Sequence, residues 1–172
     1  TGFTLVNKEG KILIDGEYVP SSLYDFAPHH VWINNRYFLL TEWDNGFDTL
    51  ILIDAVTLQR QKLANPIARF ALSSDDQWLA LEPYVTSPSG SELSDMRFYH
   101  WTGKSYQVEY SASPPDFIRT MLWIPGNDGL ELTALFRDQS LQVYDQETAT
   151  WRLITTLPED NWWVMDSTPC RE

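Results

Sequence analysis

The feature that most constrains this chain is a repeated unit of about 40 residues, in which short apolar runs alternate with turn residues. The expected strands of the first unit are residues 31–33, 36–43, 49–54 and 59–64. Those of the second unit are 67–72, 77–84, 96–101 and 106–111, and those of the third are 117–124, 130–136, 140–145 and 151–157. Units of this kind cannot bury both faces alone, so at least three must pack together. The pattern predicts an all-β fold.

The architecture that fits such units is a small or incomplete β-propeller-like array of about three four-stranded antiparallel units. We expect residues 1–172 to form a single domain, since the composition does not change along the chain. An N-terminal meander is expected before the units, with strands at residues 3–6, 11–14 and 17–19. Its second turn is assigned to Asp15-Gly16, because Asp followed by Gly suits positive φ angles in a hairpin turn.

The second strand of each unit is the most apolar and is expected to lie in the core. These core strands contain residues 37–40, 78–81 and 130–136. The last strand of each unit alternates polar and apolar residues, as at Gln107, Glu109 and Arg152, which predicts a solvent-facing edge.

Charge narrows the class of partner. The chain has 12 basic and 24 acidic residues, which gives a formal net charge of -12. Nucleic acid is therefore not expected as a partner, since binding it needs a positive surface that displaces counterions. A protein with a basic contact face would be attracted instead and captured faster at low salt, although a merely soluble acidic surface accounts for the charge equally well.

A single cysteine, Cys170, excludes an intramolecular disulfide, and nothing near it is arranged to activate a thiol. No apolar run approaches the roughly 20 residues that span a bilayer, so no membrane span is expected. The chain begins at Thr1 rather than Met, so we expect a trimmed form whose targeting segment is not part of it.

No catalytic residue, cofactor or metal site is expected. The sequence lacks a nucleophile elbow, a zinc-protease motif, a P-loop and a dinucleotide fingerprint. His29 and His30 are adjacent, so their side chains point in opposite directions in an extended segment, and His100 is expected within a strand. The segment at Asp44 and Asn45 is typical of a hairpin turn rather than of a calcium loop.

The turn Ser73-Ser74-Asp75-Asp76 is the candidate partner-binding site, although polar residues are expected in a turn between two strands whatever its function. Two strong expected strands flank it, so it should form a small, rigid tip that enters a narrow cleft at low entropic cost. Its hydroxyl groups can both donate and accept hydrogen bonds there. Four tryptophans, if exposed, would enlarge such an interface, although tryptophan in a sheet protein is more often a core residue. These are Trp123, Trp151, Trp162 and Trp163.

The second unit also carries an insertion rich in Ser, Gly and Pro between Val85 and Asp95. Long insertions of this composition in compact β proteins are either linkers or binding loops, and the residues alone leave both interpretations open.

Over residues 28–157, with its three four-strand units and the serine pair Ser73-Ser74, the chain resembles the immunity proteins that bacteria make against their own type VI secreted peptidoglycan amidases. The resemblance implies a periplasmic inhibitor that occludes a papain-like Cys-His active site, with one serine bonded to the amidase histidine. Ser21-Ser22 is the rival serine pair and, with Asp44 and Asn45, would form the rim of the interface. Substitution of Ser73 or Ser74 by Arg is expected to weaken inhibition without unfolding the protein.

Two other classes of function remain open from the residues. The first is a non-catalytic propeller-type binding or scaffold module for a peptide or a glycan. The second is an enzyme acting through acidic groups at one mouth of the array.

Overall fold

A computed structural model of the protein describes residues 2–6, 12–17, 30–44, 47–84, 94–126 and 129–158. These residues form thirteen strands, which confirms the all-β fold. The strands are β1 (Gly2–Val6), β2 (Ile12–Glu17), β3 (His30–Ile33), β4 (Tyr37–Asp44), β5 (Phe47–Asp54), β6 (Arg60–Leu72), β7 (Trp78–Pro83), β8 (Met96–Trp101), β9 (Tyr106–Ala112), β10 (Ile118–Pro125), β11 (Leu130–Phe136), β12 (Ser140–Asp145) and β13 (Thr150–Thr156). Within the described ranges no helix is long and apolar enough to cross a membrane.

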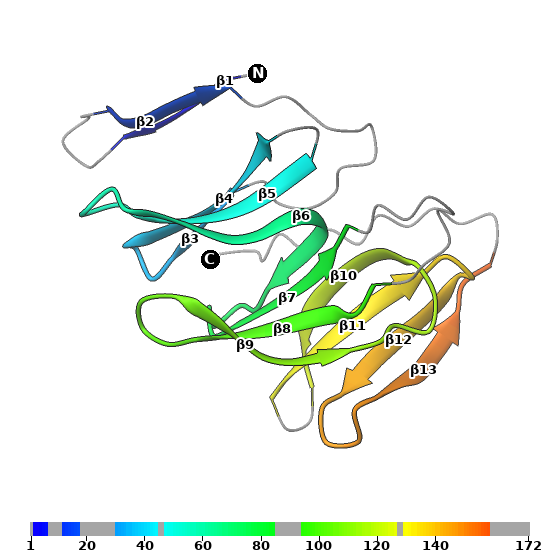
Figure 1. The fold of residues 1–172 in the computed structure, drawn as a ribbon. Helices are drawn as coiled ribbons and strands as arrows, with labels where there is room; N and C mark the ends of the chain where they lie inside the picture. Colours follow the sequence, from blue (N-terminus) through cyan, green and yellow to red (C-terminus); the bar gives the residue numbers. More distant parts are fainter. Residues whose placement is uncertain are drawn as a thin grey trace. The chain divides into compact units, whose positions relative to one another are not determined.

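The strands form antiparallel sheets in which neighbours in sequence are neighbours in space (Figure 1). Strands β3 to β9 follow one another in a seven-stranded sheet, β10 to β13 form a four-stranded sheet, and β1 pairs with β2. Neither larger sheet closes into a ring among the described strands. The predicted strand positions within all three repeated units are confirmed to within a few residues.

The chain divides into two compact units, residues 1–68 and residues 69–172. The first unit contains β1 to β5 and the first part of β6. The second contains the end of β6 and all strands from β7 to β13.

In the first compact unit, β3 and β4 are joined by a tight turn at Asn34-Asn35. Both residues have positive φ angles, 41° and 59°, and the Arg36 N–H donates to the Ile33 carbonyl at 3.2 Å. This geometry is that of a type I′ turn, and asparagine tolerates it because its short side chain relieves the left-handed conformation. The two strands that follow contribute a small buried cluster, against which Trp32 packs. The cluster contains Phe38, Leu40, Ile51 and Ile53.

Strand β6 corrects the prediction of separate strands at 59–64 and 67–72, because the structure joins them into one strand of 13 residues. The first part of β6 pairs with β5 from Arg60 to Ile67, and its end leads through a turn into β7. One long strand is therefore hydrogen-bonded to both of its neighbours in the sheet, β5 and β7. The Asn65 side chain donates a hydrogen bond to the Thr49 hydroxyl, which ties the middle of β6 to β5.

The core of the second compact unit lies between the end of the seven-stranded sheet and the four-stranded sheet. Phe98 of β8 is fully buried there and stacks on Tyr144 of β12, with ring centroids 4.9 Å apart. Full burial of a large apolar side chain stabilises a fold by about 1.5–3 kcal/mol, so this cluster is a major source of stability. Its buried members are Ala71, Ala80, Met96, Phe98, Ile118, Met121, Trp123, Leu132, Ala134, Phe136 and Tyr144.

The last strand of every repeated unit carries a β-bulge at the same place. In the pairing of β5 with β6, Leu63 is the extra residue, since Leu50 faces Ala64 and Ile51 faces Lys62. In the same way Glu109 is extra in β9, opposite β8, and Ile154 is extra in β13, opposite β12. Bulges increase the local twist of a strand. The β5–β6 pairing has a further irregularity between Asp48 and Leu50, which the pairings of β9 and β13 do not show.

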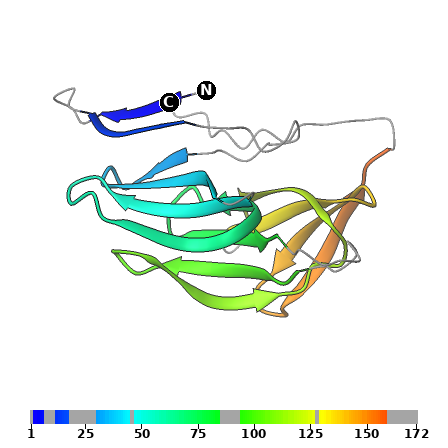
Figure 2. The same ribbon diagram turned by 45° about the horizontal axis from the view of Figure 1, so that its top comes forward.

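The last strands of the second and third units face solvent, as predicted. Gln107 and Glu109 of β9 and Arg152 of β13 are all exposed. Figure 2, in which the molecule is turned about the horizontal axis, shows β13 as the outermost strand of the four-stranded sheet.

The N-terminal prediction of a turn at Asp15-Gly16 is wrong. Both residues lie inside β2, where Asp15 faces Thr4 and Gly16 faces Phe3. An Asp-Gly pair makes a hairpin only if the strands on its two sides pair with each other, and here β2 pairs along its whole length with β1. The expected strand at 17–19 retains only Glu17, the last residue of β2, and residues 18 and 19 lie outside the described ranges.

Candidate functional site

The turn predicted as the partner-binding site joins β6 to β7. The Ser73 N–H donates to the Trp78 carbonyl at 2.8 Å, and the Asp76 N–H donates to the Ser73 carbonyl at 3.0 Å. Asp76 has a φ angle of 61°, in the left-handed region, where Asp and Asn are the most tolerated residues after Gly. These contacts close the turn and give it one backbone geometry.

The Ser73 side chain is not available to a partner, because it is buried, with 1% of its surface exposed. Its hydroxyl donates to Asp75 Oδ1 at 2.6 Å and accepts from the Trp78 N–H at 2.8 Å. A hydroxyl has one proton to donate, and Ser73 uses it inside the turn. Because Ser73 is buried, we now expect Ser73→Arg to disturb the turn itself, and Ser74→Arg remains the substitution that tests binding.

Ser74 is the residue that this turn presents to solvent. Ser74 and Asp75 are both exposed. Asp75, however, accepts hydrogen bonds from Ser73 and from the Gln77 N–H at 3.0 Å, so its carboxylate also supports the turn. Of the four predicted residues, Ser74 is the exposed side chain whose replacement leaves the network around Asp75 intact.

A buried tyrosine holds the turn from the opposite side. Tyr106, at the start of β9, donates its phenolic hydrogen to the Asp76 carbonyl at 2.7 Å. Burial raises the pKa of Tyr106 above its ordinary value, and the negative charges of Asp76 and Asp75 raise it further. The phenol therefore stays protonated and keeps donating throughout the physiological pH range.

The predicted rim lies mostly outside the described part of the chain. Ser21, Ser22 and Asn45 fall in ranges that the structure does not describe. Asp44 is the last residue of β4 and faces Phe47 in the pairing with β5. It belongs to the first compact unit, whereas the Ser73–Asp76 turn belongs to the second.

Two of the tryptophans expected at the surface are core residues instead. Trp123 is buried, and its indole N–H donates to the Ala71 carbonyl at 3.1 Å. Trp151 is half-buried and packs edge-on against Phe136, with ring centroids 5.1 Å apart. Large rings on the inner face of a sheet fill the space between layers, which is why both point inward. Trp162 and Trp163 lie outside the described ranges.

The remaining chemical candidates show no assembled centre. His100 is half-buried and its ring packs against Trp78, with centroids 4.8 Å apart. His30 is the first residue of β3, and His29 lies outside the described ranges. Among the residues that the structure describes, no three His, Cys, Asp or Glu side chains lie close enough to hold a metal ion.

The insertion of the second repeated unit falls in residues 85–93, which lie outside the described part of the chain. The residues just after it form hydrogen bonds with the rest of the structure. The Ser94 hydroxyl donates to the Pro83 carbonyl at 2.7 Å. The Ser113 hydroxyl donates to the Asp95 carboxylate at 2.5 Å. The return of the chain into β8 is thus anchored on both sides.

Sequence reasoning missed a pair of matched turns. Asp54 Oδ1 accepts from the N–H groups of Val56 and Thr57, and Asp145 Oδ1 accepts in the same way from Glu147 and Thr148. The fourth residue after each aspartate, Leu58 or Ala149, has a positive φ angle. The signal was present in the sequence as Asp-x-x-Thr after the third strand of the first and third units.

A second feature that sequence reasoning missed is an ion pair between Arg69 and Glu82 in the second compact unit. This one has no sequence signal. Arg69 of β6 donates to Glu82 Oε2 of β7 at 2.6 Å and, through Nε, to the Arg119 carbonyl of β10 at 3.0 Å. The Glu82 side chain is almost entirely buried, and that burial raises its pKa even though Arg69 opposes the rise. The pair links three strands and both sheets of this unit, which is a structural role.

The comparisons with known proteins add no relationship. No protein-family model matches the chain, and no curated protein sequence matches it significantly.

Proposed function

We propose that this protein is a non-catalytic immunity protein that binds a secreted peptidoglycan amidase in the periplasm and occludes its Cys-His active site. One observation carries the proposal: Ser74 stands exposed on a turn whose backbone and neighbouring side chains are pinned by Ser73, Asp75 and Tyr106. A turn that is already rigid loses little conformational entropy when it enters a cleft.

The mechanism is occlusion by shape. The Ser74 hydroxyl enters the cleft and bonds to the amidase histidine, while Ser73 acts from behind as a support of the turn rather than as a contact residue. Stable retention needs an interface of roughly 1,600 Å² in total with a few desolvated anchors. The net charge of -12 favours an amidase whose contact face is basic and speeds its capture at low salt.

The same proposal includes an incomplete propeller-like arrangement of the three repeated units. It is supported by the β-bulge that recurs in the last strand of each unit, opposite the third strand. Radial stacking of such units leaves their turns at the rim of the array, where a partner can reach them.

The test is inhibition of a purified Cys-His amidase encoded beside this protein's own reading frame, assayed on purified peptidoglycan. The wild-type protein should inhibit the amidase and hydrolyse no peptidoglycan itself. Ser74→Arg places a long charged side chain at the cleft entrance and should weaken binding in isothermal titration at least about tenfold, which corresponds to about 1.4 kcal/mol.

Gln146→Arg is the matched control, since Gln146 is also an exposed turn residue and the substitution changes the charge equally. It should bind like the wild type. Equal binding by Ser74→Arg and wild type would remove this turn from the interface. Absence of any inhibition by the wild-type protein would sink the immunity function and leave the peptide- or glycan-binding module as the better explanation.

A further inference from the structure

The matched bulges allow β9 and β13, which stand at the ends of their sheets, to be compared position by position, whereas β6 has a neighbour on both sides. At the bulge, β6 presents Lys62-Leu63, β9 presents Val108-Glu109 and β13 presents Leu153-Ile154. Proteins protect exposed strand edges with bulges and with charged side chains at the edge. The edge strand β9 has both devices, whereas the bulge of β13 is apolar and the nearest charge, Arg152, lies beside it.

Strand β13 is also the most exposed of these edges. All of its residues except Trp151 are exposed, with 57% of the Leu153 surface and 47% of the Ile154 surface accessible. The strand stands at the end of the four-stranded sheet, and no described strand pairs with its outer side (Figure 1). Its outer backbone N–H and C=O groups are thus placed to pair with a further strand.

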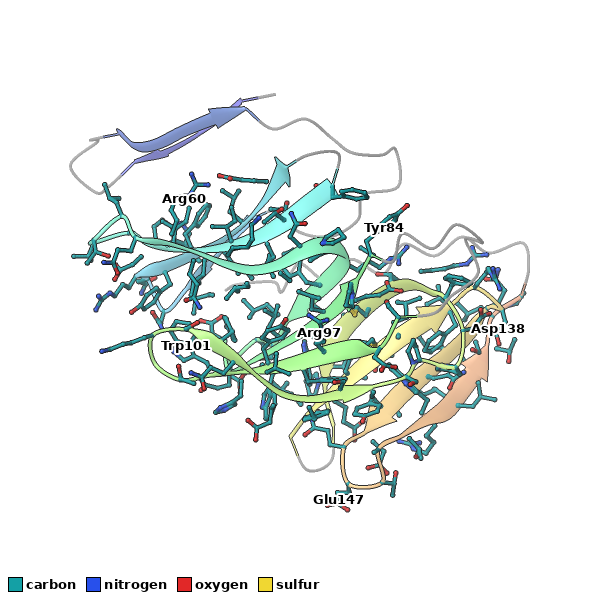
Figure 3. All side chains as sticks on the ribbon, in the orientation of Figure 1. Arg60, Tyr84, Arg97, Trp101, Asp138 and Glu147 are labelled. Carbon is teal, nitrogen blue, oxygen red and sulfur yellow. The ribbon has the colours of Figure 1, made fainter. Side chains whose placement is uncertain are left out.

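Acidic side chains flank this apolar edge at both of its ends. Asp145 ends β12 and Glu147 lies in the turn that leads into β13, where the charge of Arg152 also acts on Asp145. At the other end the Leu157 N–H donates to the Gln139 carbonyl at 2.9 Å, which brings the chain after β13 beside the turn that carries Asp138. Arg137 of that turn forms an ion pair with Asp116 at 3.2 Å, whereas Asp138 accepts from the Ser140 N–H. Figure 3 labels Glu147 and Asp138 at the two ends of the four-stranded sheet. Backbone and hydroxyl hydrogen bonds lower the pKa of Asp138 and Asp145, so both carboxylates are ionised at neutral pH.

We propose that the outer edge of β13 binds an extended segment of a partner protein, apolar and β-branched in its centre and basic at both ends, which adds a strand to the four-stranded sheet. Main-chain hydrogen bonds along the edge supply affinity, and the contacts to Leu153 and Ile154 supply specificity. The flanking carboxylates select lysine or arginine at the ends of the segment.

A second copy of this chain is the less suitable occupant. Each copy has a net charge of -12, so two copies repel one another, most strongly at low salt. Pairing of two β13 edges would also bring the acidic turns of one copy toward those of the other. The inference goes beyond the proposed amidase inhibition, because it depends only on the edge of β13.

The test uses a synthetic peptide of about ten residues, alternating valine and threonine in the centre with lysines at both ends, a length suited to one strand. Isothermal titration should detect binding to the wild-type protein, weaker at high salt, and hydrogen exchange should show new protection of the β13 amides. Ile154→Lys supplies the missing edge charge and should weaken binding at least about tenfold. Val108→Lys is the matched control on the β9 edge, where Val108 is similarly exposed, and should bind normally.

Two altered peptides separate the components of binding. A peptide with alternate N-methylated amides cannot form the ladder and should not bind, and one with glutamates at its ends should bind more weakly. Equal binding of all peptides, or equal loss in Ile154→Lys and Val108→Lys, would overturn the proposal. A dimer in sedimentation that Ile154→Lys abolishes would assign the edge to a second copy instead. Ser74→Arg should bind the lysine-flanked peptide normally, so this test and the amidase test can fail independently.

Discussion

Arg69 Nη1 lies 2.6 Å from Glu82 Oε2, and this ion pair joins two neighbouring strands where the glutamate is almost completely buried. Burial raises the pKa of Glu82 above its ordinary value, while the charge of Arg69 limits the rise. Removing one partner leaves a buried carboxylate unpaired, which lowers the free energy of unfolding. The net stabilisation by the intact pair is small, so the pair mainly predicts which substitutions destabilise the second compact unit.

Arg69→Met should destabilise the protein by about 3 kcal/mol at pH 8, near the low end for a broken buried pair because Arg69 itself is partly exposed. The loss should shrink as the pH falls, since protonation removes the unpaired charge of Glu82. Urea unfolding at pH 8 and pH 5 measures both values. Adding Glu82→Gln to Arg69→Met should restore much of the stability at pH 8, and a loss independent of pH would contradict the assignment.

Glu82→Gln alone should flatten the dependence of stability on pH. Because the pKa of Glu82 is higher in the folded protein than in the unfolded chain, the folded protein binds more protons between those two values. Stability therefore falls as the pH rises through that interval, and the variant should lack this fall. Melting temperatures measured across the acidic to neutral range compare the two proteins.

Ser73→Ala and Ser74→Ala form a matched pair of neighbours with opposite expectations. Ser73→Ala leaves the buried Trp78 N–H without the acceptor it uses and frees Asp75 from the turn, and should cost about 1–3 kcal/mol. Ser74→Ala removes an exposed hydroxyl and should change stability by less than about 0.5 kcal/mol. Denaturant midpoints give the comparison, and equal effects would show that Ser73 does not support the turn.

Asp54→Asn and Asp145→Asn test the matched turns of the first and third units. The Arg36 guanidinium, 2.7 Å from Asp54 Oδ2, holds the pKa of Asp54 well below its usual range, and two backbone N–H groups assist. A carboxyl with a lowered pKa contributes stability that is present at neutral pH and is lost as the pH falls through the acidic range.

Asp54→Asn should therefore lose more stability at pH 7 than at pH 3. The effect should exceed that of Asp145→Asn, whose backbone contacts are the same but on which Arg152 acts through its charge rather than through a hydrogen-bonded ion pair such as Arg36–Asp54. Thermal unfolding at the two pH values is the measurement. A larger effect at Asp145 would mean that the ion pair with Arg36 adds nothing to the turn.

Much of the fold was predictable because its signals are local. Apolar runs between turn residues located β3 to β5 and β7 to β13, and alternation along β9 and β13 indicated their exposed edges. The errors arose where strand pairing decides between two conformations that the local sequence allows. Asp15-Gly16 has the composition of a turn but lies in β2, because β1 supplies a partner along that whole strand.

The position of the turn between β6 and β7 was predicted from the sequence, but its side-chain contacts were not. Composition identified a small polar tip between two strands, and the structure has that turn. Which serine faces outward depends on the Asp75 carboxylate and the Trp78 N–H, and no spacing rule separates Ser73 from Ser74. Trp123 was expected at the surface. The local sequence could not show its burial, because the Ala71 carbonyl that accepts from its indole N–H lies 52 residues earlier in the chain.

The sequence by itself determined the all-β class and the approximate positions of most strands from β3 to β13, because backbone preferences and turn chemistry act over a few neighbouring residues. Only the tertiary structure decided which polar groups were enclosed. Arg69 and Glu82 meet because two strands pair side by side, and Tyr106 reaches Asp76 across 30 residues of chain. Burial and hydrogen bonding of such groups depend on contacts between distant segments, and those contacts exist only once the sheets have packed.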